Sequence, residues 1–207
     1  MILYHGTTER LLGTILRDGL RPRKPGTKGN WPKVPSGSGR VYMTEGYAMY
    51  YAFATTREKE RLVVLAIDTD KLDPWMFVPD EDWIAQRMKM EDPSNTTPLL
   101  ALTKRCRKLA VERADLWEYS LKDMGTVGYL GTIPPSAIVK YAIIEREAYI
   151  PLIFRGHDPS VGIMNHRIMG AVYRGWMDWL FVGKTEADWV GGKFTYPERT
   201  GVTVTEV

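Results

Sequence analysis

The residues best suited to chemistry stand at the start of the chain, in the run Leu3-Tyr4-His5-Gly6-Thr7-Thr8. The apolar residues up to Tyr4 predict a short strand, and the helical spacing that begins near Thr8 predicts a helix that stops at Gly19. His5 is therefore expected where the strand ends and the chain turns into the helix. Gly6 beside it lets a ligand approach the backbone closely. The alternative is a turn histidine with no chemical role.

Three tyrosines form a second group, in a helix expected to follow a short strand at residues 40–43 and a cap at Thr44. Tyr47, Tyr50 and Tyr51 recur at the spacing of one helix face. Such a stripe is usually part of a core, but every buried tyrosine hydroxyl requires a hydrogen-bond partner. Rings that stack on a flat ligand, with their hydroxyls in water, would remove that conflict.

A basic loop is expected at residues 21–40, which carry six Lys and Arg residues and few apolar ones. Arg23 and Arg40 with Trp31 would suit a phosphate-rich partner such as DNA or RNA, because the cations can bind phosphates and the ring can stack on a base. The alternative is a solvated, disordered connection. Further along, the acidic residues 80–82 indicate either the start of a helix or a solvated turn.

The composition is that of an ordinary globular protein, with 207 residues, 44% hydrophobic and 26% charged. No apolar run is long enough to span a membrane, and no secretion signal is recognisable, so we expect a cytoplasmic protein without a membrane partner. The single cysteine excludes an internal disulfide, and three separated histidines do not indicate a metal site. The net charge of +3 permits a nucleic-acid partner without requiring one.

These elements predict the α+β class and one domain over residues 1–207. Residues 1–145 would form the core, with a buried central strand at 62–67 and a helical insertion at about 80–124. The helix that begins near Pro98 has an apolar side and a basic side that is either solvated or in contact with phosphate. Residues 146–207 would pack on the core as a C-terminal extension, with a helix at 163–181 covering the sheet and an edge strand at 201–207.

The order of the motifs resembles the ADP-ribosyltransferase superfamily, and within it the diphtheria-toxin-like, PARP-like branch. The motifs that carry the resemblance are Tyr4-His5-Gly6-Thr7, Asp18-Gly19-Leu20, and the segments 39–44, 47–52 and 62–68. Segment 129–138 is similar to strands of the RNA 2′-phosphotransferases, which also use NAD, and of DNA-modifying ADP-ribosyltransferase toxins. The resemblance covers residues 1–145 and rests on order and spacing, since no single motif is specific.

The resemblance implies a split antiparallel sheet with flanking and inserted helices, which holds NAD as a co-substrate and needs no metal. Tyr4, His5, Gly6, Thr7, Tyr42, Thr44 and Tyr50 would bind NAD. His5 would contact the adenosine ribose, and Gly6 would present its backbone to the nicotinamide amide. Tyr50 would stack on the nicotinamide, with Tyr51 as its rival. Cleavage of the nicotinamide–ribose bond leaves positive charge on the ribose, so the site must also provide negative or dipolar groups.

One departure from the family concerns its acid. Members usually carry a Glu near the strand at the cleft, but residues 126–129 of this chain contain no acid. Glu118, one short segment upstream, is the expected substitute, together with His5, Tyr42 and a tyrosine of residues 50–51 as the catalytic set. Glu145 and Glu147 are alternatives.

Three functions therefore stay open. The first is an NAD-dependent mono-ADP-ribosyltransferase that modifies a nucleic acid or a protein, with Arg23, Trp31 and Arg40 contacting this acceptor. The second is an RNA 2′-phosphotransferase, in which Arg57 and Arg61 would supply the basic residues of that family. The third is a module that binds NAD or ADP-ribose without turning it over.

Overall fold

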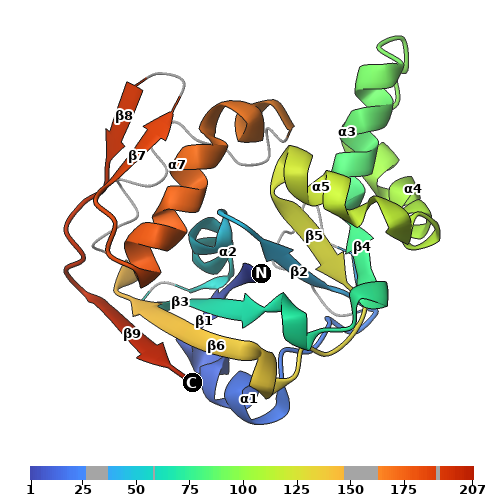
Figure 1. The fold of residues 1–207 in the computed structure, drawn as a ribbon. Coiled ribbons are helices and arrows are strands. Elements are labelled where there is room, and N and C mark those ends of the chain that lie inside the picture. Colours follow the sequence, from blue (N-terminus) through green and yellow to red (C-terminus); the bar gives the residue numbers. More distant parts are fainter. Residues whose placement is uncertain (27–36, 58, 147–162, 190–191) are drawn as a thin grey trace.

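The computed structural model describes residues 1–26, 37–57, 59–146, 163–189 and 192–207, and it has the predicted α+β architecture (Figure 1). A seven-stranded sheet, antiparallel at every pairing, is surrounded by helices, and a separate two-stranded hairpin lies near the C-terminal helix. Of the described helices, none combines the length and apolar character that crossing a bilayer requires.

The strands of the main sheet lie in the order β4-β5-β2-β1-β3-β6-β9. They are β1 (Ile2–Thr8), β2 (Val41–Thr44), β3 (Leu62–Asp68), β4 (Phe77–Pro79), β5 (Thr126–Tyr129), β6 (Ile138–Ile144) and β9 (Val202–Glu206), and the hairpin is β7 (Glu186–Trp189) with β8 (Gly192–Thr195). The helices are α1 (Glu9–Asp18), α2 (Ala48–Thr55), α3 (Glu81–Glu91), α4 (Leu99–Glu112), α5 (Trp117–Met124) and α7 (Ile163–Phe181).

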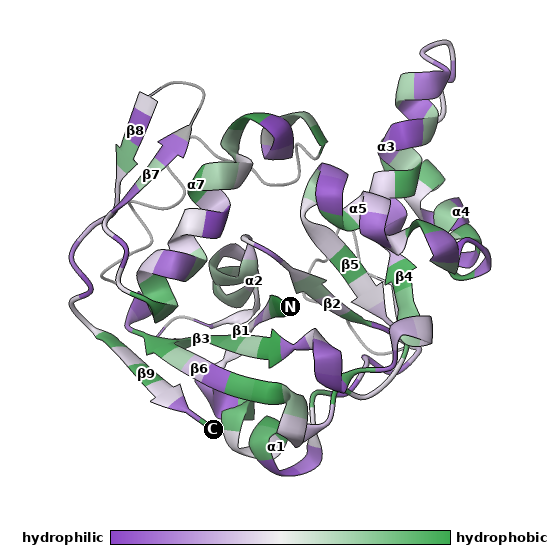
Figure 2. Cartoon of the chain, viewed as in Figure 1, coloured by the Kyte–Doolittle hydropathy of each residue, from purple (hydrophilic) through white to green (hydrophobic). Residues whose placement is uncertain are grey.

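The central strand β3 confirms the prediction from its continuous apolar run. Its residues from Leu62 to Ile67 are buried on both faces of the sheet. One face packs against α2 and α7, and the other packs against α1 and α5. Figure 2 shows hydrophobic residues along β3 and β6, while hydrophilic residues are interspersed along the protruding α3. The strand is therefore the shared floor of two cores.

The first strand is longer than predicted. The expected break at His5 and Gly6 is wrong, because β1 pairs with β3 without interruption from Ile2 opposite Asp68 to Thr8 opposite Leu62. Backbone hydrogen bonds to a fully buried neighbour therefore outweigh the local turn tendency of glycine. As a consequence His5 is a strand residue, with its side chain on the face of Leu3 and away from α2.

The sheet is weakest between β1 and β2. These neighbours share one registered pair, Tyr4 with Thr44, whereas β2 pairs with β5 along its whole length and β1 does so with β3. The sheet is thus divided into a part with β4, β5 and β2 and a part with β1, β3, β6 and β9.

The C-terminal elements agree with two predictions and add one element. The helix α7 has the predicted bounds and covers the face of the sheet that also contacts α2. Strand β9 pairs only with β6, at the edge of the sheet, as expected. The hairpin of β7 and β8 was not predicted.

Candidate functional site

The junction between β1 and β2 is organised around His5. Directly after the single pair of Tyr4 and Thr44, the ring of His5 reaches β2, and its Nδ1 lies 2.8 Å from the carbonyl oxygen of Tyr42. An imidazole therefore links the two strands where their backbone hydrogen bonding stops.

This hydrogen bond determines which nitrogen of the ring is protonated. A carbonyl oxygen can only accept, so Nδ1 of His5 carries a proton and Nε2 of the neutral ring presents a lone pair. Burial lowers the pKa of His5, and the hydrogen bond to Tyr42 opposes this effect without cancelling it. The ring is therefore neutral at pH 7. No partner for Nε2 is found among the residues that the structure describes.

On the opposite face of β1, the helix α2 packs directly on the backbone. A Cβ atom at Gly6 would lie 2.0 Å from the carbonyl oxygen of Ala48 and 2.4 Å from the nitrogen of Ala52. Only glycine fits beneath the helix without a shift of the backbone. Gly6 therefore sets the distance between α2 and the strand, and this packing alone accounts for a glycine at the position.

The turn between β2 and α2 differs from the prediction. The helix begins at Ala48, so Thr44 is not its cap. The buried Thr44 hydroxyl instead accepts the backbone N–H groups of Gly46 and Tyr47, at 3.1 and 3.0 Å. These two hydrogen bonds stabilise the turn that leads into the helix.

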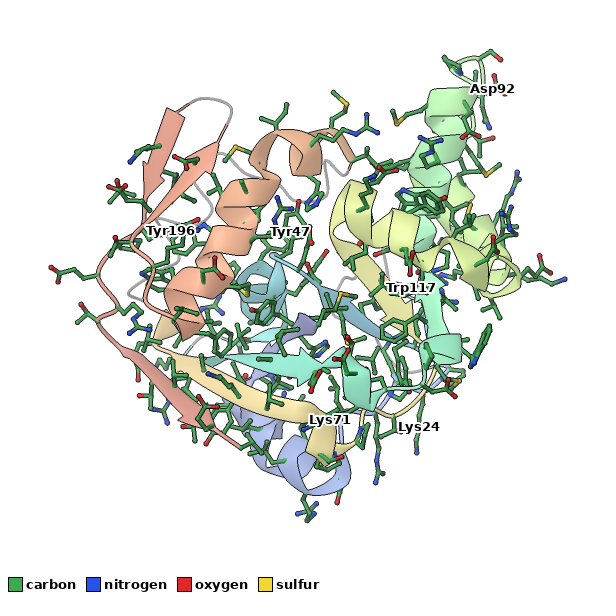
Figure 3. The ribbon with its side chains drawn as sticks, in the orientation of Figure 1. Lys24, Tyr47, Lys71, Asp92, Trp117 and Tyr196 are labelled. Carbon is green, nitrogen blue, oxygen red and sulfur yellow. The ribbon has the colours of Figure 1, made fainter. Side chains whose placement is uncertain are left out.

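The three tyrosines near this helix separate into one core residue and two half-buried ones. Tyr47 is buried next to α7, with its hydroxyl 2.9 Å from Nδ1 of His166 (Figure 3). The rings of Tyr50 and Tyr51 meet edge to face, with centroids 5.7 Å apart. Burial raises the pKa of Tyr51. Both residues belong to α2, which packs on the face of β1 opposite the His5 side chain.

Tyr42 is held by an acid that the sequence patterns did not single out. Its hydroxyl lies 2.6 and 2.7 Å from the two carboxylate oxygens of Glu81, at the start of α3, and accepts the N–H of Gly37 at 2.8 Å. Burial, with the negative charge of Glu81, raises the pKa of Tyr42 well above its ordinary value. Tyr42 is therefore a neutral hydroxyl fixed between strand and helix.

Glu81 also binds arginine inside the protein. Its carboxylate lies 3.3 Å from Nη1 of Arg40 and 3.8 Å from Nε of Arg107, and the Glu81 and Arg40 side chains are 3% and 5% exposed. Asp80 caps α3 by accepting the N–H of Asp82. Of the two alternatives for the acidic residues, the helix start is thus confirmed. The solvated turn is wrong, because Arg40 and Tyr42 compensate the buried charge.

Two of the other residues predicted to bind NAD have their side chains in the core. Tyr4 stacks on Phe181 with ring centroids 5.4 Å apart, and burial raises its pKa to about 12. The side chain of Thr7 is buried as well.

Glu118 lies in a groove of about 420 Å³ whose lining includes neither Tyr42 nor His5. The other residues that line this groove are Met1, Glu45, Trp117, Leu121, Lys122 and Arg174. Glu118 and Lys122 are exposed on α5, and Trp117 of the same helix packs on Phe77 (Figure 3). The predicted catalytic acid therefore has access to solvent, whereas Glu81 does not.

A second histidine, which is buried, joins α7 to the end of β2. Nε2 of His166 lies 2.8 Å from Glu45, and its Nδ1 meets the Tyr47 hydroxyl. Arg174 binds the same carboxylate oxygen of Glu45 at 2.9 Å. Burial of Glu45 opposes its ionisation, but the hydrogen bonds from His166 and Arg174 prevail and lower its pKa.

The remaining predicted residues do not gather at one place. Trp31 and Glu147 lie outside the described residues. Arg23 is half-buried, and its carbonyl oxygen accepts the N–H of Gly39 at 2.9 Å.

The two arginines of the alternative function lie before β3. Arg57 is exposed. Arg61 forms ion pairs with Glu9 and, at 3.5 Å, with Glu145. Glu145 is therefore engaged near the ends of β3 and β6, away from the junction of β1 and β2.

Within the described residues, no group of three or more His, Cys, Asp or Glu side chains is placed to hold a metal ion. No protein-family model, curated protein or solved structure matched this chain.

Proposed function

We propose that this protein is an NAD-dependent mono-ADP-ribosyltransferase that modifies a macromolecule and releases nicotinamide. The observation that carries the proposal is the state of His5. Its Nδ1 is occupied by the Tyr42 carbonyl, its ring is neutral, and Nε2 is left as an acceptor. A ribose hydroxyl of NAD is a donor of the kind that this lone pair accepts.

The weak pairing within the sheet supports the same proposal. The sequence resemblance implies a split antiparallel sheet, and β1 and β2 share a single registered pair, which lies beside His5. A histidine fixed on a strand is held more rigidly than one on a loop, so little order is lost when NAD binds. A ring held in one orientation is what NAD bound in a bent shape would require.

The reaction is a substitution at the ribose carbon that carries nicotinamide. A lone pair of the acceptor forms the new bond to that carbon. The carbon–nitrogen bond breaks, and its electron pair neutralises the charge of the pyridinium ring, which leaves as nicotinamide. The acceptor atom gives up one proton, which goes to solvent or to a carboxylate such as that of Glu118. Positive charge builds up on the ribose during this step, so nearby carboxylates stabilise it.

The test uses NAD labelled in the adenosine part, with DNA, RNA and protein offered separately as acceptors. Labelled acceptor together with released nicotinamide is the expected result. His5→Ala should lose both signals, whereas Lys108→Ala, an exposed residue of α4, should lose neither. No label transfer and no nicotinamide release with any acceptor, from folded protein that binds no NAD, would reject the proposal.

A second candidate is a module that binds NAD without turnover. The specific observation in its favour is the composition of β5, in which all four residues are buried and none is an acid. Calorimetry separates the candidates, since this module would bind NAD through His5 with no nicotinamide released. The RNA 2′-phosphotransferase is less favoured, because Arg61 is already paired with Glu9 and Glu145.

A further inference from the structure

The groove that contains Glu118 is formed by four separate elements. Met1 precedes β1, Glu45 follows β2, α5 contributes four residues, and Arg174 comes from α7. Its volume of about 420 Å³ falls in the range of small-ligand sites. Because the elements come from distant parts of the chain, the groove exists only in the folded protein.

The polar groups of the groove differ in what they are bonded to. Both His166 and Arg174 bind one carboxylate oxygen of Glu45, so its orientation is set by the protein. Glu118 and Lys122 stand one helical turn apart on α5, and neither has a hydrogen bond or ion pair within the described part of the chain. The groove therefore offers a fixed carboxylate, an available carboxylate and an available cation.

These groups match the chemistry of one nucleotide. Carboxylates accept hydrogen bonds from the exocyclic amine of a base, as Glu and Asp do from cytosine. The face of the Trp117 indole ring offers a flat apolar surface on which a base can stack. Lys122 can meet the phosphate. A base enters such a groove only when it is unstacked, so single-stranded nucleic acid suits it better than a duplex.

The groove also lies close to the proposed NAD contact. A strand rises about 3.3 Å per residue, so Glu45 is roughly 10 Å along the chain from Tyr42, whose carbonyl holds His5. Both places border the single pair that joins β1 to β2. A ligand in the groove is therefore near enough to accept a group from NAD bound at His5.

We infer that this groove binds an amine-bearing base of single-stranded nucleic acid, the acceptor of the proposed transferase. The inference thus rests on the proposed function for its biological meaning, while the binding itself can be measured alone. Glu118 and Glu45 would receive the base amine, Trp117 would stack on its ring, and Lys122 would neutralise the phosphate.

The experiment measures fluorescence anisotropy of labelled oligodeoxycytidylate, oligodeoxyadenylate and oligothymidylate of equal length. Wild type should bind the two amine-bearing strands more tightly than oligothymidylate. Glu118→Leu should remove most of this preference, because the side chain then has no acceptor for the amine. Lys122→Ala should weaken all three alike and reduce the slope of log affinity against log salt by about one. Trp117→Leu should weaken all three by roughly tenfold.

The matched controls lie on α3, where Arg87 and Glu91 stand four residues apart, as Glu118 and Lys122 do. Arg87→Ala and Glu91→Leu should leave binding unchanged. Trp117 also packs on Phe77. If Trp117→Leu unfolds the protein, the variants of the exposed residues Glu118 and Lys122 decide the test. Equal binding by wild type and the α5 variants, or no binding of any oligonucleotide, would overturn the inference.

Release of nicotinamide from NAD to water is followed in parallel, because it needs no acceptor strand. Cleavage of NAD by a protein whose oligonucleotide binding ignores the groove would reject the groove and keep the transferase. Binding that depends on Glu118 and Lys122 in a protein that neither binds nor cleaves NAD would keep the groove and reject the transferase. Labelling of protein instead of nucleic acid, with no oligonucleotide bound, would also reject the groove.

Discussion

Two histidines of the described residues, the partly buried His5 and the buried His166, contact β2 and the residue that follows it, and they are bonded differently. His166 contacts protein through both ring nitrogens, with Glu45 on one side and the hydroxyl of Tyr47 on the other. His5 contacts protein through one nitrogen, which faces the carbonyl of Tyr42. The ring of His166 joins α7 to the end of β2. The ring of His5 has a second nitrogen, Nε2, for which the described residues provide no partner.

The difference separates a structural histidine from a candidate ligand-binding one. A buried polar atom normally has a partner, and loss of that partner costs stability. Both nitrogens of His166 satisfy this requirement within the protein, so nothing further is needed to explain its position. Nε2 of His5 has no protein partner among the described residues and is not one of their buried unpartnered atoms, so water or a ligand that donates a hydrogen bond can reach it. Four predictions test this division.

The largest effect is expected from His5→Ala on NAD turnover. Loss of the group that orients the ribose should lower kcat/KM for nicotinamide release by about a hundredfold or more. The melting temperature should change little, because the change removes one hydrogen bond to a backbone carbonyl, worth about 1 kcal/mol. Steady-state kinetics and thermal unfolding check the two parts. Turnover equal to that of wild type would place His5 with His166 as a structural residue.

The next effect concerns Gly6, which lies beside His5 and beneath α2. The Cβ of Gly6→Ala would meet the backbone of Ala48 and Ala52, which cannot rotate away. We expect the free energy of unfolding to fall by about 3 kcal/mol, at the upper end of the usual cost of overpacking. Urea unfolding measures it.

Gly13→Ala is the matched control for this variant. Gly13 lies inside α1, and a Cβ atom added there would meet nothing within 4 Å. Alanine should stabilise the protein by up to about 1 kcal/mol, because glycine is a poor helix former. If Gly6→Ala and Gly13→Ala have the same stability, α2 does not depend on close contact with β1. The packing of α2 on β1 is then looser than the surroundings of Gly6 imply.

A smaller effect on stability is expected from His166→Ala. The change removes hydrogen bonds to Glu45 and Tyr47, although Arg174 still neutralises the carboxylate, so we expect a loss of about 2 kcal/mol. Met164→Ala, at an exposed position of the same helix, should cost less than about 0.5 kcal/mol. Urea unfolding of both variants makes the comparison. A loss at His166 no greater than at Met164 would remove the structural assignment of this ring.

Local patterns in the sequence predicted most of the elements because each pattern reports its own surroundings. The continuous apolar run of β3 and the helical spacing of α7 are examples, and both elements have nearly the predicted bounds. The end of β1 was misjudged because its length depends on pairing with β3, about sixty residues later in the chain. Pairing between distant segments leaves no mark on the local pattern.

The polar contacts of the site are harder to predict for the same reason. The acidic neighbours of Glu81 left a helix start and a solvated turn as alternatives, and its burial by Tyr42 and Arg40 depends on residues some forty positions earlier. His166 and Glu45 are separated by more than a hundred residues. His5 stands out in the sequence as unusual, but only the fold reveals which nitrogen is occupied. Charge alone, without the partner, does not indicate burial.

The smallest predicted effect is on how stability depends on pH. Burial lowers the pKa of His5 below its ordinary 6.5. Above pH 6.5 the ring is neutral in both folded and unfolded chains and contributes nothing to the pH dependence of stability. As the pH falls below 6.5, the unfolded chain takes up a proton that the folded chain takes up only at lower pH, so stability declines until the pH passes the folded pKa.

Glu45 should act in a separate and more acidic window. Its pKa lies below the ordinary 4.5, since the hydrogen bonds from His166 and Arg174 outweigh burial. Its contribution is complete above pH 4.5 and disappears as the pH falls through its folded pKa. Urea unfolding from pH 8 down to about pH 2 tests both windows. The stability difference between wild type and His5→Ala should change only below pH 6.5, and the difference between wild type and Glu45→Gln only below pH 4.5. A difference for His5→Ala that is constant from pH 8 down to pH 5 would mean that the ring is as easily protonated in the folded protein as in water, so burial would not favour the neutral ring that leaves Nε2 as an acceptor.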